Sequence, residues 1–117
     1  APKAPSAGPP ELELDAALAL QRDLLVAFAS EEFQSSLREV CAASAGDSKN
    51  LRIERQKLIL GVQSQVLPKH GFEGSAMGVM HMLRLFGSPA LAASEEVQRI
   101  GVEIDGLLQA RAPEATD

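Results

Sequence analysis

The spacing of the apolar residues is the feature that most constrains the fold of this chain. From about position 11 to position 110 they recur at intervals of three and four, as on one face of a helix. No convincing run alternates apolar and polar residues between turn-forming residues, which is the pattern of a half-buried strand. Aromatic side chains are scarce, with four Phe and no Trp or Tyr, so the core is aliphatic. The sequence therefore predicts an all-α fold, a single compact bundle of about five helices.

Residues that begin and end helices divide this pattern into segments. Helices are predicted at about 11–29, from 31 to Gly46, at about 49–67, from 76 to about 86, and, after restarts at Ser88 and Ser94, up to about 110. Ser30 and Ser75 are expected as N-caps, because their side chains accept hydrogen bonds from the first turn. Pro68 and Gly71 are expected to close the third helix.

The predicted fourth helix is apolar on more than one side. Its inner stripe is expected to consist of Ala76, Val79, Met80, Leu83 and Phe86. Met77, Met82 and Leu85 fall outside that stripe, and a helix of this kind is typical of the buried centre of a bundle. Methionine is also common on adaptable binding surfaces, so Met77, Met80 and Met82 either fill the core or leave part of the helix exposed as a groove for a partner. Gly78 lies among them and favours close approach of another helix.

The two ends of the chain differ in composition from the helical part. Prolines and a glycine are concentrated near the start, at Pro2, Pro5, Gly8, Pro9 and Pro10. They remove backbone donors and resist helix formation, so we expect an extended Pro-rich tail over 1–10. A helical domain is expected over 11–111 and a frayed C-terminus over 112–117. A proline-rich tail is disordered alone or lies extended on a partner, so its four prolines are candidate partner-binding residues.

The sequence shows no constellation of catalytic or metal-binding residues. A zinc site needs about four ligands at suitable spacing. Cys41 and the two distant histidines, His70 and His81, do not provide them. Cys41 falls on the apolar face of the second predicted helix, which favours an inert core thiol over a nucleophile. The strand–turn–helix pattern of a nucleophile elbow is also missing. We expect no enzymatic activity, no bound metal and no cofactor.

Charge and hydropathy argue against two further classes of function. The chain carries 11 basic and 16 acidic residues, a net charge of −5, whereas nucleic-acid binding depends on neutralising phosphates. A nucleic-acid partner is therefore not expected. No apolar run approaches the ~20 residues that span a bilayer, so no transmembrane segment is expected. The expected partner is another protein or a multi-protein complex.

The connector before the fourth helix holds two glycines, Gly71 and Gly74. Their spacing resembles the glycine loop of some RNA-binding modules, but a phosphate loop needs a nearby Lys or Arg, and Glu73 lies between them. The favoured interpretation is a helix-ending glycine followed by a tight turn between helices. If the fourth helix is partly exposed, the candidate partner-binding residues in this region are Gly71, Phe72, Gly74, Met77, Gly78 and Met82.

A series of landmarks follows a recognisable order. It consists of Ala27-Phe28, then Gln63-x-Gln65-Val66-x-x-Lys69-x-Gly71-Phe72, then Gly78-Val79-Met80, and then Arg84-Leu85 before a final amphipathic helix. This order resembles the protein C-ten family of small eukaryotic proteins over about residues 18–110. The resemblance does not extend well to the proline-rich tail or to 88–94. It implies a helical fold, no known enzymatic activity and a cytoplasmic setting, and it says little about mechanism.

These observations predict a non-catalytic interaction or scaffold protein, a small subunit or adaptor in a larger cytoplasmic assembly. Two alternatives remain open. The Ala- and Pro-rich start at Ala1, without Met, fits an accessory subunit of an organellar membrane complex, in a plastid or mitochondrion, that is imported and processed to Ala1. An enzyme or a lipid-carrying bundle without recognisable motifs is the other alternative.

Overall fold

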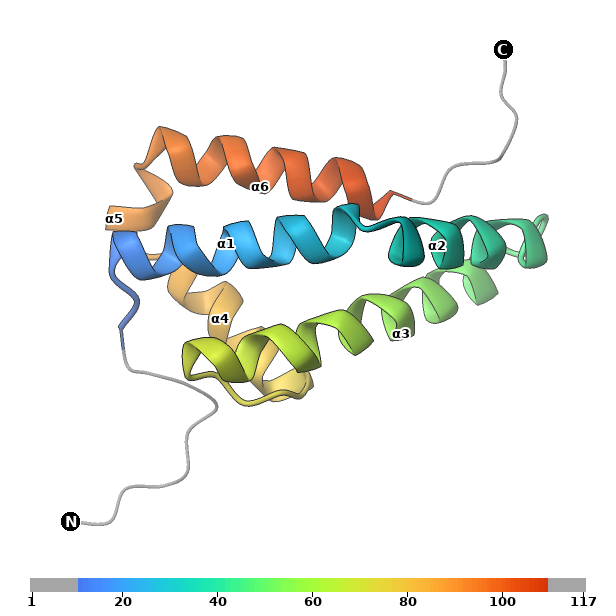
Figure 1. The fold of residues 1–117 in the computed structure, drawn as a ribbon, viewed down its shortest axis with the longest axis horizontal. Helices are drawn as coiled ribbons and strands as arrows, with labels where there is room; N and C mark the ends of the chain where they lie inside the picture. The colour runs from blue at the N-terminus through green and yellow to red at the C-terminus, as the bar shows by residue number, and fades with distance from the viewer. Residues whose placement is uncertain (1–10, 110–117) are drawn as a thin grey trace.

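The computed structural model describes residues 11–109, and all regular structure in this range is helical (Figure 1). The elements are α1 (Leu14–Ala29), α2 (Glu31–Ala43), α3 (Ser48–Val66), the 3-10 helix η1 (Leu67–His70), α4 (Ala76–Phe86), α5 (Pro89–Ala92) and α6 (Glu95–Leu108). The predicted all-α bundle is confirmed. The predicted tail over 1–10, with its prolines, and the predicted frayed end over 112–117 lie outside the described residues. None of the helices within 11–109 is long and apolar enough to cross a membrane.

Side-chain caps begin most of the helices near the predicted positions. Ser30 Oγ accepts the backbone N–H of Phe33 at 3.1 Å, which satisfies a donor in the first turn of α2. The side chains of Asp47, Ser75 and Ser94 cap α3, α4 and α6 in the same way. α1 starts later than predicted, at residue 14 instead of about 11, and no side chain caps its N-terminus.

The end of α3 is set by proline chemistry. Pro68 has no N–H to donate to the Ser64 carbonyl, so the α-helix stops at Val66 and tightens into η1. Gly71 follows with φ 86°, in the left-handed region that glycine occupies without strain. Further along the chain, Pro89 starts the short helix α5, which the sequence pattern had marked only as a restart.

α1 lies between α6 on one side and α3 on the other (Figure 1). α6 runs in the same direction as α1. Gln21 Nε2 of α1 donates to the Val97 carbonyl at 3.0 Å, and Gln34 Nε2, in the first turn of α2, donates to the Leu107 carbonyl at 3.1 Å. α3 runs back antiparallel along α2 and α1, and α4 leads from the end of α3 across to α5 (Figure 1).

The core consists of two clusters of buried side chains. The larger cluster joins α1, α2, the end of α3, the connector and α4, through Leu20, Leu24, Phe28, Phe33, Leu37, Val66, Leu67, Phe72 and Met82. The smaller cluster joins the start of α1 to α5 and α6, through Ala17, Leu18, Leu91, Val97 and Ile100. The rings of Phe28 and Phe33 meet edge-to-face, with centroids 5.0 Å apart, across the bend between α1 and α2. Because both clusters include α1, this helix holds the bundle together.

The orientation of α4 differs from the prediction. Gly78 and Met82 are buried, whereas the side chains predicted to face inward include Met80, which is 57% exposed. Leu83 is 59% exposed and Ala76 is exposed too, so the predicted inner stripe is wrong for these three residues, and α4 is not the buried centre of the bundle. A Cβ at Gly78 would lie 1.7 Å from the Glu73 carbonyl oxygen. The Gly78 side of α4 therefore packs against the backbone of the connector. The prediction that another helix approaches Gly78 is wrong.

Candidate functional site

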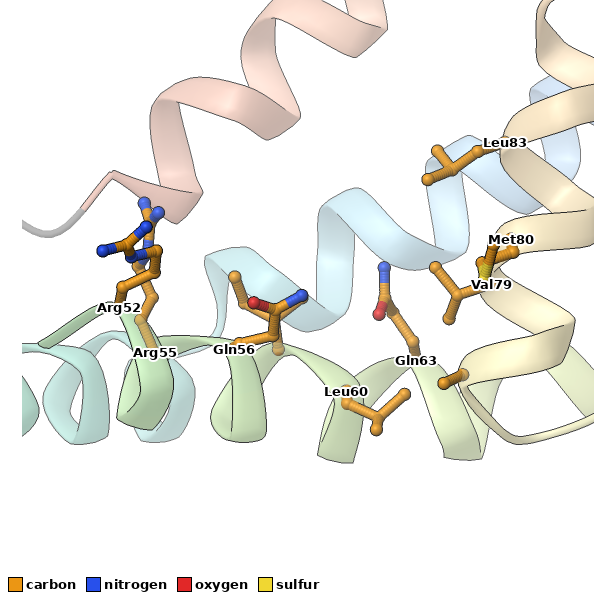
Figure 2. A pocket seen from close by; sticks show the side chains of 10 residues that line it. Arg52, Arg55, Gln56, Leu60, Gln63, Val79, Met80 and Leu83 are labelled. Carbon is orange, nitrogen blue, oxygen red and sulfur yellow. The ribbon is translucent and has the colours of Figure 1, made fainter. Parts of the chain in front are cut away.

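A groove, the α3–α4 groove, opens between α3 and α4 with a volume of about 490 Å³. Two helices line it, with Arg52, Arg55, Gln56, Ile59, Leu60 and Gln63 from α3 and Ala76, Val79, Met80 and Leu83 from α4. Figure 2 shows α3 along one side, α4 closing one end and α1 behind, with the two arginines at the opposite end beneath α6. The groove therefore has an apolar end at α4 and a cationic end near α6.

The apolar end consists of side chains that the bundle leaves uncovered. More than half of Met80 and of Leu83 is exposed, and both face α3 residues that are only partly buried, among them Ile59 and Leu60. α3 has 19 residues but fully buries only Val66, because the shorter α4 crosses it only near its C-terminal end (Figure 1). Met80 and Leu83 are therefore large apolar side chains that the described helices leave uncovered on one side of the groove.

The cationic end is formed by Arg52 and Arg55. Nη1 of Arg55 donates to the carbonyl oxygen of Leu108 at 3.2 Å, which connects α3 to the last turn of α6 and satisfies a carbonyl there. Within residues 11–109 no carboxylate lies within 4.0 Å of either guanidinium. The ion pairs of this range join other residues. Arg52 is exposed, and its guanidinium makes no hydrogen bond or ion pair within residues 11–109.

The connector between η1 and α4 contains three of the predicted site residues, Gly71, Phe72 and Gly74. Gly71 ends η1 and is exposed, and its positive φ explains the glycine. Gly74 is exposed too, and a Cβ there would lie 2.5 Å from the Ser64 carbonyl oxygen, so the glycine allows the connector to pass close to α3. Gly78 allows the same connector to fold back on α4. The two glycines at 71 and 74 therefore form a tight turn between helices, the interpretation that the sequence favoured.

Three of the predicted partner-binding residues lie in the interior. Phe72 and Met82 are each 3% exposed and belong to the larger core cluster, and Gly78 is buried against the connector. In this structure these three residues are part of the interior of the domain, and their contact with a partner stays a prediction. Met77 is 64% exposed, on the outer surface of α4, but it does not line the α3–α4 groove.

The residues that were weighed as catalytic or metal-binding lie apart from the groove. His70 Nε2 is 2.6 Å from Asp23 Oδ2, which links η1 to α1, a contact that the sequence did not predict. Cys41 is buried on α2, and the ring of His81 meets that of Phe72 edge-on, with centroids 5.8 Å apart. Within 11–109 no group of three or more His, Cys, Asp or Glu side chains could hold a metal ion. The groove itself is lined by aliphatic, thioether, amide and guanidinium groups.

Sequence reasoning missed most of the groove. It placed Leu83 inside, left Met80 either in the core or on an exposed groove, and gave no role to Arg52 or Arg55. One available indication was that two consecutive long segments, 49–67 and 76–86, both carry apolar residues on more than one face. Such helices need more covering surface than a bundle of this size provides.

Comparisons of this chain with protein-family models, with curated proteins and with solved structures find no match. The resemblance to the protein C-ten family therefore stays a prediction from the order of its landmarks.

Proposed function

We propose that this protein is a non-catalytic interaction protein, a small subunit or adaptor of a larger assembly, and that a partner protein docks in the α3–α4 groove. The observation that carries the proposal is the exposure of Met80 and Leu83 beside the partly buried Ile59 and Leu60. A cytoplasmic setting belongs to the same proposal and is supported by the protein C-ten resemblance alone.

The energetics of burial support docking at this place. Fully burying a Leu or Met side chain contributes about 1.5–3 kcal/mol. Met80 and Leu83 are 57% and 59% exposed, so most of that contribution is still available to a partner that covers them. Each would add about 1–2 kcal/mol to a docking interaction. Methionine adapts its shape to different surfaces, which suits this position for a binding face.

Site-specific photo-cross-linking tests the proposal. The full chain is prepared with a photo-reactive amino acid at position 80, and a matched control carries it at Val102, which is 70% exposed on α6 and outside the groove. Both are irradiated in extract from the native cells. We expect a defined protein adduct from position 80 that is absent from position 102 and is suppressed by a Leu83→Glu substitution in the same chain. The same adducts from both positions, or none from position 80, would contradict docking in the groove.

A further inference from the structure

We infer that the occupant of the α3–α4 groove is an amphipathic α-helix of another protein, with an apolar stripe that covers the α4 end and at least one Asp or Glu that meets Arg52 and Arg55. The inference rests on the proposed docking function and adds the chemistry of the partner.

The shape of the groove favours a helix over an extended segment. Its walls are helices whose backbone groups bond within the helix, so an extended peptide would meet no open sheet edge to pair with. Its own N–H and C=O groups would then lie unpaired against aliphatic side chains, whereas a helix satisfies them internally. From Arg52 to Gln63 the groove follows eleven residue steps of α3, or about 16 Å at 1.5 Å per residue. This length accommodates about three turns of a docked helix.

The charge of the groove favours an acidic partner. The chain as a whole carries a net charge of −5, yet the end of the groove presents two arginines without a carboxylate within 4.0 Å in residues 11–109. Arg55 already donates one hydrogen bond to Leu108, but a guanidinium has five N–H donors. A carboxylate placed between Arg52 and Arg55 would receive charge-assisted hydrogen bonds from both. Complementary charges at one end would also fix the direction in which the helix docks.

A second copy of this chain fits the groove less well. Outside α3 and α4, the large apolar residues that are exposed within the described range are Leu14, Val26 and Val102. They lie singly on α1 and α6, so neither helix offers an apolar stripe with three- or four-residue spacing. α4 does offer such a stripe, but its helix contains no acidic residue to meet Arg52 and Arg55. α3 exposes one large apolar residue, Ile53, so it offers no stripe either. The described helices of a second copy therefore fit the groove less well than a helix from a different protein.

Selection of displayed helical peptides on the full-length protein tests this inference. The library has random positions on a helix-forming backbone, and enriched peptides are measured by fluorescence anisotropy against the protein and its variants. We expect enriched peptides with apolar residues at i, i+3 or i+4, and i+7, and with Asp or Glu at one end. Met80→Glu or Leu83→Glu should abolish their binding. Arg52→Glu should weaken peptide binding about three- to tenfold and reduce the dependence of binding on salt, since the ion pair between Arg52 and the peptide carboxylate is exposed to solvent.

Arg99→Glu is the matched control, because Arg99 is an exposed arginine of α6 outside the groove, and this variant should bind as the parent does. Enriched peptides that need Met80 but lack acidic residues, or that ignore Arg52→Glu, would overturn the acidic helix and leave docking in place. If no peptide is enriched, or if binding does not depend on Met80 and Leu83, docking in the groove itself is wrong. A dimer in sedimentation equilibrium that Met80→Glu dissociates would make a second copy the occupant and overturn the inference.

Discussion

Replacing Gly78 by Ala tests the contact that sets the rotation of α4. An ideal Cβ at this position would lie 1.7 Å from the Glu73 carbonyl oxygen and 2.7 Å from its carbonyl carbon. Ordinary van der Waals contacts of a Cβ begin at about 3.4 Å. Since both atoms that it meets belong to the backbone, the connector or α4 would have to move by about 1.7 Å. No change of side-chain rotamer relieves this clash.

The size of the effect follows from three contributions. Overpacking at a tight site costs about 1–3 kcal/mol. Moving the Glu73 carbonyl also breaks its 2.9 Å hydrogen bond from the Ser75 N–H, a further loss of about 1 kcal/mol. Against these losses, Ala is preferred over Gly inside a helix by about 1 kcal/mol. We expect the free energy of unfolding to fall by about 2 kcal/mol, with a decrease in Tm of roughly 8–16 °C for a domain of this size.

Urea denaturation followed by far-UV circular dichroism measures this change. Gly61→Ala is the matched control, because Gly61 lies inside α3 and a Cβ there meets nothing within 4 Å. That variant should gain about 0.5–1 kcal/mol from helix propensity and from the lower entropy of the unfolded chain. If Gly78→Ala is as stable as Gly61→Ala, the connector yields without cost, and the contact with Glu73 does not set the rotation of α4.

Three further substitutions test the capping, the interior and the groove. Ser30→Ala should lower the free energy of unfolding by about 1 kcal/mol in urea, because it removes the N-cap of α2, and an unchanged midpoint would contradict this. Gln21→Met should leave thermal stability unchanged or raise it by about 1 kcal/mol, because Oε1 of Gln21 is buried without a partner in the described range. A loss above about 2 kcal/mol would mean that the hydrogen bond to Val97 outweighs that orphaned oxygen. Met80→Glu should change the unfolding free energy by less than about 0.5 kcal/mol, and a larger loss would place this side chain in the core.

The helices were predictable from the sequence because their boundaries depend on local chemistry. A side-chain oxygen at Ser30 or Ser75 caps the following turn whatever the rest of the chain does. Gly46 adopts φ 83° after α2, and Pro68 ends the i to i−4 ladder of α3. These effects act within about four residues, so a single sequence contains the information needed to place them.

The orientation of α4 was not predictable in the same way. Both of its faces carry apolar residues, so periodicity alone does not decide between the stripe through Met80 and Leu83 and the stripe through Gly78 and Met82. The choice depends on the connector backbone at Glu73, which touches Gly78 only after the chain has folded back. The groove follows from that choice. It also depends on where α4 crosses α3, which no local pattern encodes.

The parallel pairing of α1 with α6 has a consequence for how the protein is synthesised. The residues that join these helices are far apart in sequence, 76 positions for Gln21 and Val97 and 74 for Arg22 and Glu96. Ribosomes add about 5–20 residues per second, so α1 waits roughly 4–15 s before α6 exists. During that time the face of α1 that carries Ala17 is not yet covered by α5 and α6, although α2 and α3 can already pair. The nascent chain is therefore most open to chaperones, and to wrong partners, between the appearance of α1 and the emergence of α6.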